Sequence, residues 1–283
     1  MNKRYVNVAI CQRTIKDSPK DNLRESLELI EKAASKMKDP DIVLLPEVNI
    51  GISDNLEQSR EIAKEFQGPY LDGMCELAKK LGICIIPGSF YSLTEDGRTG
   101  NTTVFIDRNG KILGSYSKIH LFDAFSIKES DRVAPGDTLG VVDTEFGRIG
   151  LQICYDLRFP ELTRLQVLAG ARAIFHMAFF PGGNVLPPRT DHWDGLVNSM
   201  AMLNQTWVCS CNAYGDAHGE HPFGRSRIID PWGMPVAMAG NHEDIICGTL
   251  DLDYNETARI STGNLSNRRP DLYEKFRKEY DLH

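Results

Sequence analysis

The sequence lacks the long apolar runs of membrane proteins. Nowhere among its 283 residues do about 18 apolar residues follow one another, so we expect no membrane-spanning helix. The opening MNKRYVNVAICQRTI contains basic residues, but its apolar part is short and alternates with polar residues. This alternation indicates a β-strand rather than an export signal, so we expect a cytoplasmic protein.

The sequence also lacks the signatures of phosphate and nucleic-acid binding. Its formal net charge is −7, and no cluster of Lys and Arg is interleaved with aromatic residues. We therefore expect no nucleic-acid partner. Neither G-x-G-x-x-G nor G-x-x-x-x-G-K-[ST] occurs, so the sequence predicts no dinucleotide site, and we expect no cofactor.

The cysteines do not form a disulfide pattern. Their number is seven, which is odd, and the chain is long. A reducing compartment and mostly buried thiols are therefore expected. A zinc site is an alternative, because four potential ligands lie within 13 residues: Cys209, Cys211, His218 and His221. However, Cys-x-Cys on a strand differs from the wider spacing of structural zinc sites, so we predict no metal.

Strand and helix patterns alternate along the whole chain without repeats, low-complexity segments or linkers. Strands outnumber helices, and hairpins such as the one around Asn109-Gly110 mix with crossover units. This combination favours a layered α/β sandwich with helices outside rather than an all-parallel sheet. We expect one domain over residues 1–283, in which about 255–283 form a C-terminal arm. Helices are expected at 21–37, 70–82, 160–169 and 189–205, the first with Asp21 as its N-cap and the second closed by Gly82. Strands are expected at 5–11, 41–47, 83–90, 101–118 in two parts, 138–142, 148–153, 172–178, 206–213, 223–240 and 244–252.

Three reactive side chains each follow a buried-strand pattern directly. They are Glu47 in IVLLPEVN, Lys118 in GSYSKIHLFD and Cys154 in GLQICYDLRFPEL. Taken singly, each is typical of an exposed charge or a core thiol. Strand ends at one edge of a sheet converge, however, and a carboxylate, an ammonium and a thiol together could perform nucleophilic catalysis without a metal. The carboxylate would take the thiol's proton, and the ammonium would stabilise an oxyanion.

The same three segments resemble the signature motifs of the nitrilase superfamily of carbon–nitrogen hydrolases. They occur in that family's order, at separations of about 70 and about 36 residues, and the resemblance extends to FGRSRIIDPWG and RRPDLYEKF. The resemblance implies a four-layer α-β-β-α sandwich that forms homodimers. It also implies a catalytic Glu47–Lys118–Cys154 set, an oxyanion site that includes the backbone N–H of Tyr155, and Glu129 as a second acidic residue.

The resemblance implies an amidase acting on a small linear amide through a cysteine thioester. Members with CYDLRFPEL, such as omega-amidases and deaminated-glutathione amidases, commonly act on amides that carry a carboxylate. Arg158 could bind that carboxylate as a bidentate partner, or it could form a structural ion pair with Asp156 or Glu161. Further candidates for the substrate pocket are Phe180 and the pair His192 and Trp193.

One segment departs from the family pattern. The family usually has an Arg and an acidic residue where this chain has NSMAMLNQ, with Met200 and Leu203. The pocket or the dimer contacts are therefore expected to differ, and N-carbamoyl compounds and nitriles stay open as substrates. A papain-like Cys–His pair and a non-catalytic ligand-binding protein are the rival interpretations, but neither uses Glu47 and Lys118 together.

Overall fold

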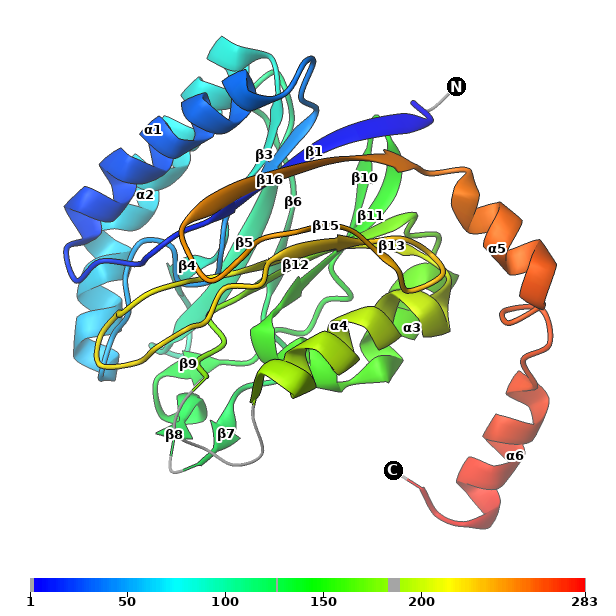
Figure 1. Ribbon diagram of the computed structural model, residues 1–283. Helices are drawn as coiled ribbons and strands as arrows, with labels where there is room; N and C mark the ends of the chain where they lie inside the picture. The colour runs from blue at the N-terminus through cyan, green and yellow to red at the C-terminus, as the bar shows by residue number, and fades with distance from the viewer. Residues whose placement is uncertain (1–2, 126, 183–188, 283) are drawn as a thin grey trace.

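Two β-sheets lie face to face in this protein, and helices cover their outer faces (Figure 1). The structure is a computed structural model that describes residues 3–125, 127–182 and 189–282. The strands are β1 Tyr5–Gln12, β2 Ile42–Leu44, β3 Cys84–Ile86, β4 Phe90–Leu93, β5 Thr99–Ile106, β6 Ile112–Ser117, β7 Asp123–Ala124, β8 Ile127–Lys128, β9 Val133–Ala134, β10 Val141–Thr144, β11 Gly147–Ile153, β12 Ala173–Ala178, β13 Trp207–Asn212, β14 Arg227–Ile229, β15 Pro235–Met238 and β16 Asp244–Asp251. The helices are α1 Pro19–Lys36, α2 Leu56–Leu81, α3 Pro160–Leu168, α4 Arg189–Asn204, α5 Tyr254–Thr262 and α6 Pro270–Glu279, with short 3₁₀ turns η1 Glu129–Asp131 and η2 Cys154–Arg158.

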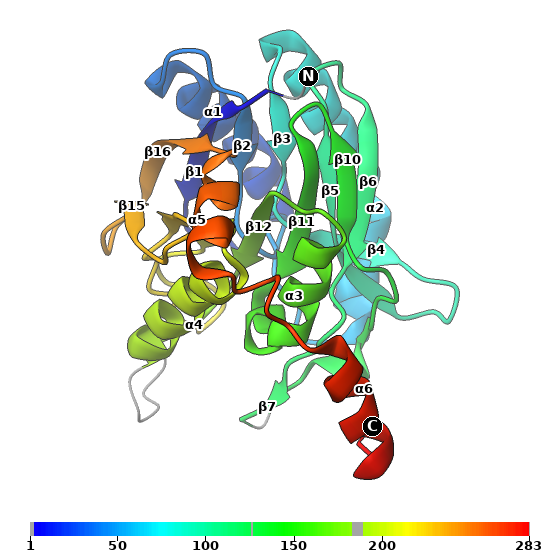
Figure 2. The ribbon, with the colours of Figure 1, turned by 90° about the vertical axis from the view of Figure 1, so that its right-hand side faces the viewer.

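The first sheet has eight strands in the order β16-β1-β2-β3-β5-β4, and β6 and β9 also pair with β5. The second has six strands in the order β10-β11-β12-β13-β14-β15. Parallel pairing joins β1 to β2 and β2 to β3 in the first sheet, and β11 to β12 and β12 to β13 in the second. The expected α-β-β-α sandwich is confirmed: α1 and α2 cover the outer face of the first sheet, and α3 and α4 cover the outer face of the second (Figure 2).

Strand β1 shows why its sequence is apolar at nearly every position. Val8 and Ile10 belong to the core between the two sheets. Ala9 and Cys11 point the other way, into the core beneath α1 and α2. Because both faces of the strand are buried, both sets of alternating residues must be apolar.

The ends of the first two helices differ from the sequence expectation at two points. The N-cap of α1 is Ser18, whose hydroxyl accepts a hydrogen bond from the N–H of Asp21, so Asp21 lies in the first turn and is not the cap. Helix α2 begins well before the expected residue 70 and continues through Pro69, although Gly-Pro usually ends a helix. Gly82 caps its C-terminus in the left-handed conformation, as predicted.

The C-terminal residues form α5 and α6, and α6 extends away from the sandwich (Figures 1 and 2). No residue of α6 is buried, so this helix makes little contact with the rest of the described chain. None of the helices within the described ranges is both long enough and apolar enough to cross a bilayer.

Candidate active site

The ends of three strands bring Glu47, Lys118 and Cys154 together. Glu47 follows β2, Lys118 follows β6 and Cys154 follows β11. All three are buried, with exposed fractions of 4%, 2% and 8%. The Nζ atom of Lys118 lies 3.0 Å from Oε1 of Glu47. The structure thus assembles the carboxylate, ammonium and thiol that the strand-end pattern places at one edge.

Two hydrogen bonds fix the carboxylate of Glu47. The side-chain amide of Asn101 donates to Oε1 at 2.9 Å, and the backbone N–H of Phe179 donates to Oε2 at 2.7 Å. The chain before Glu47 is held close to Gly88, where a Cβ atom would lie 1.9 Å from the carbonyl oxygen of Pro46. Only glycine fits at this contact, so the local packing determines where the carboxylate stands.

Lys118 lies between two carboxylates. Besides Glu47, Nζ contacts both oxygens of Glu129 at 2.9 and 3.2 Å. Glu129 is itself held by the N–H of Phe122 at 2.6 Å. Burial opposes the positive charge, but the carboxylates of Glu129 and Glu47 outweigh it and hold the pKa of Lys118 well above its usual range. The lysine is therefore a fixed cation beside the thiol.

Cys154 is a neutral thiol at neutral pH. Burial raises its pKa well above the usual range, and the charge of Glu47 and a hydrogen bond to that carboxylate raise it further. Lys118 acts in the opposite direction. The thiol therefore needs a base to become a nucleophile, and Glu47 is the carboxylate in contact with it.

The turn after β11 presents the thiol. Cys154 has a φ of +47°, a left-handed conformation that is unusual for a side chain other than glycine. Asp156, fully buried, accepts hydrogen bonds from the N–H of Ile153 at 2.9 Å, from the hydroxyl of Tyr116 at 2.7 Å and from the backbone of His120 at 3.2 Å. Asp156 therefore holds this turn in place, and Tyr155 is the second residue of the 3₁₀ segment that begins at Cys154.

His176 on β12 holds the backbone of Cys154. Its Nε2 lies 3.0 Å from the carbonyl oxygen of Cys154, and its Nδ1 lies 2.7 Å from the hydroxyl of Ser210. A carbonyl only accepts hydrogen bonds, so Nε2 carries the proton and Nδ1 accepts from Ser210. Burial lowers the pKa of His176 to about 4, and the imidazole is neutral at physiological pH.

The buried His176 should make stability depend on pH. Its folded-state pKa of about 4 lies below the ordinary 6.5, so the unfolded chain binds a proton that the folded protein excludes. Stability is therefore lost as pH falls from about 6.5 toward 4, and this residue alone should cost about 2 kcal/mol between pH 7 and pH 5. Urea unfolding of wild type and His176→Gln at both pH values measures the difference. The exposed His242→Gln serves as control, and equal pH dependence of wild type and His176→Gln would contradict the assignment.

The cavity at these residues is small and mostly apolar. Its volume is about 140 Å³. Besides the three strand-end residues it is lined by Val48, Ile52, Tyr91, Asn101, Phe122, Ile127, Glu129, Arg132, Phe179, Pro181 and Glu220. A cavity of this size, with charges at one end, suits a small linear substrate.

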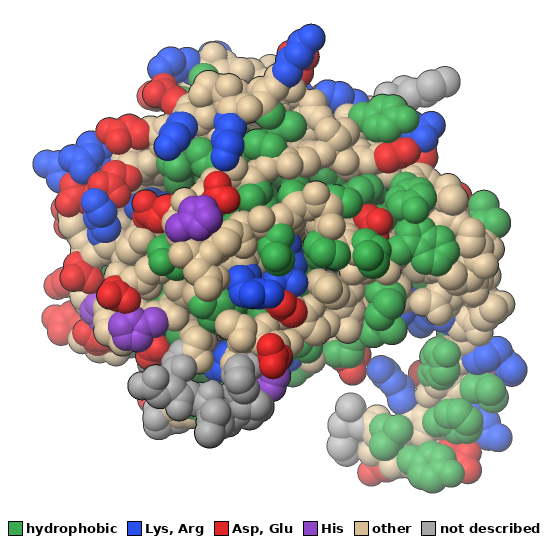
Figure 3. All heavy atoms as spheres, in the orientation of Figure 1, with side chains coloured by type: hydrophobic (Ala, Val, Ile, Leu, Met, Phe, Trp, Pro, Cys, Tyr) green, Lys and Arg blue, Asp and Glu red, His purple; other side chains and the backbone are tan. Residues whose placement is uncertain are grey.

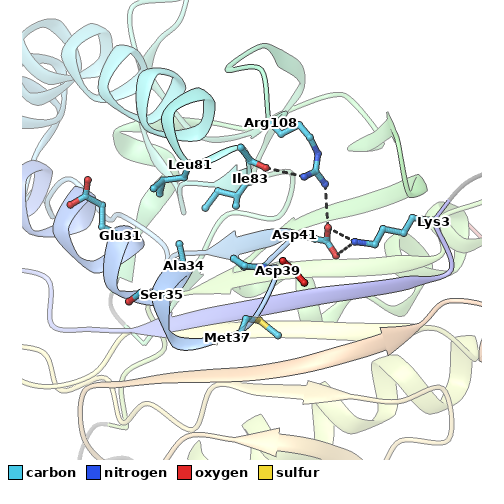
Figure 4. A pocket seen from close by; sticks show the side chains of 12 residues that line it. Lys3, Glu31, Ala34, Ser35, Met37, Asp39, Asp41, Leu81, Ile83 and Arg108 are labelled. Carbon is cyan, nitrogen blue, oxygen red and sulfur yellow. Dashed lines mark hydrogen bonds and ion pairs between the residues drawn. The ribbon is translucent and has the colours of Figure 1, made fainter.

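A larger hollow of about 490 Å³ lies near the ends of α1 and α2 (Figure 4). Its most buried polar group is the carboxylate of Asp41, which forms ion pairs with Lys3 at 2.7 Å and with Arg108 at 3.2 Å. The charges there neutralise one another, and among the described residues that line the hollow no thiol or hydroxyl contacts a carboxylate or a histidine. We therefore assign the chemistry to the smaller cavity.

The residues predicted to bind substrate, Phe180, His192, Trp193 and Arg158, lie around the cavity of Cys154 rather than among the residues that line it. Phe180 and Trp193 are buried against each other, with ring centroids 5.5 Å apart, and neither they nor His192 line the described wall of the cavity. Phe179 lines it instead, because successive residues at a strand end point to opposite sides. Arg158 is half-buried and makes no ion pair with Asp156, Glu161 or any other described residue.

The residues of the alternative zinc site do not come together. Cys209 and Cys211 lie in the core on β13, whereas His221 is exposed and paired with Asp216 and His218 is paired with Asp54. Across residues 3–125, 127–182 and 189–282, no group of three or more His, Cys, Asp or Glu side chains is arranged to hold a metal ion.

No sequence pattern marks Asn101, Phe179 or His176 as functional. Asn101 is only the polar first residue of the strand expected from position 101, and a buried amide there needs partners. Phe179 contributes a backbone N–H, for which side-chain patterns give no signal. His176 likewise appeared only as one residue of a strand.

Known proteins share both the sequence and the fold of this chain. The sequence pattern of the carbon–nitrogen hydrolase family matches residues 7–260. The chain is 31% identical over 277 residues to the deaminated glutathione amidase of Bos taurus, covering 94% of this chain and 83% of that protein. It is 30% identical over 278 residues to omega-amidase NIT2 of Xenopus tropicalis, covering 96% and 98%.

A solved structure has the same fold as this chain. Nit3 of Saccharomyces cerevisiae, a member of branch 10 of the nitrilase superfamily, superposes with a TM-score of 0.84 at 29% identity and covers 95% of this chain and 98% of its own. The predicted superfamily is thereby confirmed. This chain belongs to the carbon–nitrogen hydrolase family and is a hydrolase of carbon–nitrogen bonds.

Proposed function

We propose that this protein hydrolyses a small linear amide to a carboxylic acid and ammonia through a thioester on Cys154. The observation that carries the proposal is the buried array in which Lys118 contacts Glu47 and Glu129 beside the thiol. The amidases among the relatives support the reaction class. No cofactor or metal is needed, because the array supplies the base, the nucleophile and a cation.

The first half of the reaction forms the thioester. Glu47 takes the proton of Cys154 as the sulfur bonds to the amide carbon, and the carbonyl oxygen becomes an oxyanion. The ammonium of Lys118 and the backbone N–H of Tyr155 stabilise that oxyanion. As the C–N bond breaks, Glu47 gives its proton to the nitrogen and ammonia leaves.

The second half releases the acid. A water molecule takes the place of ammonia, Glu47 accepts one of its protons, and the resulting hydroxide bonds to the thioester carbon. The C–S bond then breaks, and the proton on Glu47 returns to the sulfur. Among the described residues, Glu129 forms no hydrogen bond with the thiol, whereas both of its oxygens accept hydrogen bonds from Lys118. Its role is therefore to hold Lys118 in place.

We further propose that the substrate carries a carboxylate. Arg158 follows the nucleophile by four residues and makes no ion pair within the described chain, so its guanidinium is available to an anion. Two relatives, named deaminated glutathione amidase and omega-amidase, support an amide of this general kind.

The segment NSMAMLNQ, which departs from the family pattern, lies on α4. Met200 is buried and Leu203 is exposed there, so the departure affects both the core side and the surface of that helix.

A substrate panel tests the proposal and separates it from its alternatives. Ammonia release would be measured with dicarboxylate monoamides, N-carbamoyl amino acids and nitriles. We expect the monoamides to give the highest kcat/KM, with ammonia but no carbon dioxide. Release of both gases from N-carbamoyl substrates would favour the alternative carbamoyl hydrolase, and a preference for nitriles would favour a nitrilase.

We also propose a cytoplasmic homodimer. All seven cysteines are free, as is typical of a reducing compartment. Exposed apolar side chains gather over β15 and toward α5 (Figure 3), and they include Trp232, Met234, Val236, Met238 and Ile260. A patch of this kind is typical of a protein interface. Light scattering that gives the mass of one chain at micromolar concentration would exclude the dimer.

A further inference from the structure

The structure contains a buried arginine beside the active site that the proposed mechanism does not use. Arg189 is the first residue of α4, and only 7% of it is exposed. Its guanidinium carbon lies 4.2 Å from the ring centroid of Phe180 and 5.6 Å from those of Phe122 and Phe125. A guanidinium thus sits among three aromatic rings and outside bulk water.

This guanidinium has no acidic partner in the described part of the chain. It makes no ion pair or hydrogen bond there, and its Nε atom is buried without a partner. Leaving a cation buried and unpaired is costly, so proteins rarely keep one that has no anion to bind. Burial accordingly lowers the pKa of Arg189.

The position of Arg189 connects it to the reaction centre. Phe122, which Arg189 contacts, lines the cavity of Cys154. The charge of a Cys154 thiolate acts on the guanidinium, and so does the charge of Glu220 at the cavity wall, although Glu220 forms no ion pair with it. The site of Arg189 therefore shares the ring of Phe122 with the cavity of Cys154.

A second unpaired arginine faces the same ring. The guanidinium carbon of Arg158 lies 6.0 Å from the Phe180 centroid. The two positive charges repel each other, and Arg158 accordingly lowers the pKa of Arg189. An anionic group bound between them would remove that repulsion and would pair with both guanidinium groups.

We propose that Arg189 is a specificity-determining residue that binds the carboxylate at the non-reacting end of the substrate. This inference rests on the proposed amidase function and adds a second cation to its substrate site. The aromatic rings around the guanidinium exclude water, which strengthens its attraction for a carboxylate. A neutral amide of the same length would gain nothing from this residue.

The test compares a charged and an uncharged amide of equal chain length. Succinamate and butanamide would be assayed with wild type, Arg189→Met and Arg189→Lys. For succinamate, we expect Arg189→Met to lower kcat/KM by about 100-fold, mainly through KM, with Arg189→Lys in between. For butanamide we expect a change of less than about twofold. Equal losses on both amides would show a structural role, and no loss on either would also overturn the proposal.

A matched control is available on α5. Arg259 is also partly buried, its pKa is also lowered by burial, and its Nε and one terminal nitrogen have no partner. Because it lies outside the cavity, Arg259→Met should change kcat/KM for succinamate by less than about twofold. A loss as large as that of Arg189→Met would mean that removing any such arginine disturbs the protein.

A binding measurement separates this proposal from the amidase function itself. Calorimetry would measure the affinity of succinate, a dicarboxylate of the same length, for wild type and Arg189→Lys. We expect at least about tenfold weaker binding in the variant, whether or not the protein hydrolyses either amide. Equal affinities would overturn the role of Arg189, whereas ammonia release that survives Cys154→Ala would overturn the proposed function alone.

Discussion

Replacing Cys154 with alanine is expected to lower kcat for amide hydrolysis by about 10⁴-fold or more. The thiol is the group that would bond to the amide carbon, and no other cysteine adjoins Lys118 and the carboxylates in the described structure. A papain-like mechanism has no support in the geometry, because His176 binds the carbonyl of Cys154 and Ser210 rather than the thiol. Ammonia release under saturating amide measures the effect.

A control variant and direct detection of the thioester complete this experiment. Cys75 on α2 is a half-buried thiol away from the cavity, and Cys75→Ala should retain full activity. Rapid acid quenching of the wild type during turnover, followed by mass spectrometry, should show the acyl mass on the peptide that contains Cys154. Activity retained in Cys154→Ala would rule out the thioester mechanism.

The sequence predicted much of the site because the chemistry lies at strand ends. A polar residue after a short apolar run is visible in one dimension, and three such residues marked Glu47, Lys118 and Cys154. The structure brings them into one cavity from two sheets, because the ends of β2 and β6 in the first sheet meet the end of β11 in the second. The resemblance to a known family added the order of the motifs, which strand patterns alone do not contain.

The parts that sequence reasoning missed depend on how segments distant in the sequence pack together. Asn101 comes from β5 and reaches both Glu47 and Glu129, at 2.9 and 3.4 Å. In the sheet, β3 separates β5 from β2, so this contact depends on a strand order that no local pattern specifies. Phe180, a predicted pocket residue, packs against Trp193 and lies beneath the guanidinium of Arg189, while its neighbour Phe179 lines the cavity. Successive side chains at a strand end point to opposite sides, so an error of one residue in the predicted end selects the wrong side chain for the cavity. Sequence patterns locate strand ends only to within a few residues.

Glu47→Gln is expected to lower kcat/KM by about 10³-fold near neutral pH, the usual contribution of a general base. Glutamine has the same shape and could still accept the hydrogen bond from the N–H of Phe179. It could not take the proton from Cys154. The loss should therefore appear without loss of folding, which thermal unfolding would verify.

The pH dependence of this variant distinguishes a general base from a merely structural carboxylate. In the wild type, burial and then the charge of Glu47 keep the pKa of Cys154 high, while Lys118 opposes them. Removing the charge of Glu47 lowers that pKa relative to the wild type, so thiolate forms at a lower pH than before. The kcat/KM of Glu47→Gln should consequently rise with pH across the alkaline range, whereas the wild type, in which Glu47 takes the thiol's proton, should show no such rise.

A matched control for Glu47→Gln exists elsewhere in the fold. The thiol of Cys84 lies 3.7 Å from Oε1 of Glu145, and this carboxylate also raises the pKa of a largely buried thiol. Glu145→Gln should leave kcat/KM and its pH profile unchanged, because that pair lies outside the cavity of Cys154. A Glu47→Gln profile parallel to that of the wild type, or a loss below about tenfold, would mean that another group takes the thiol's proton.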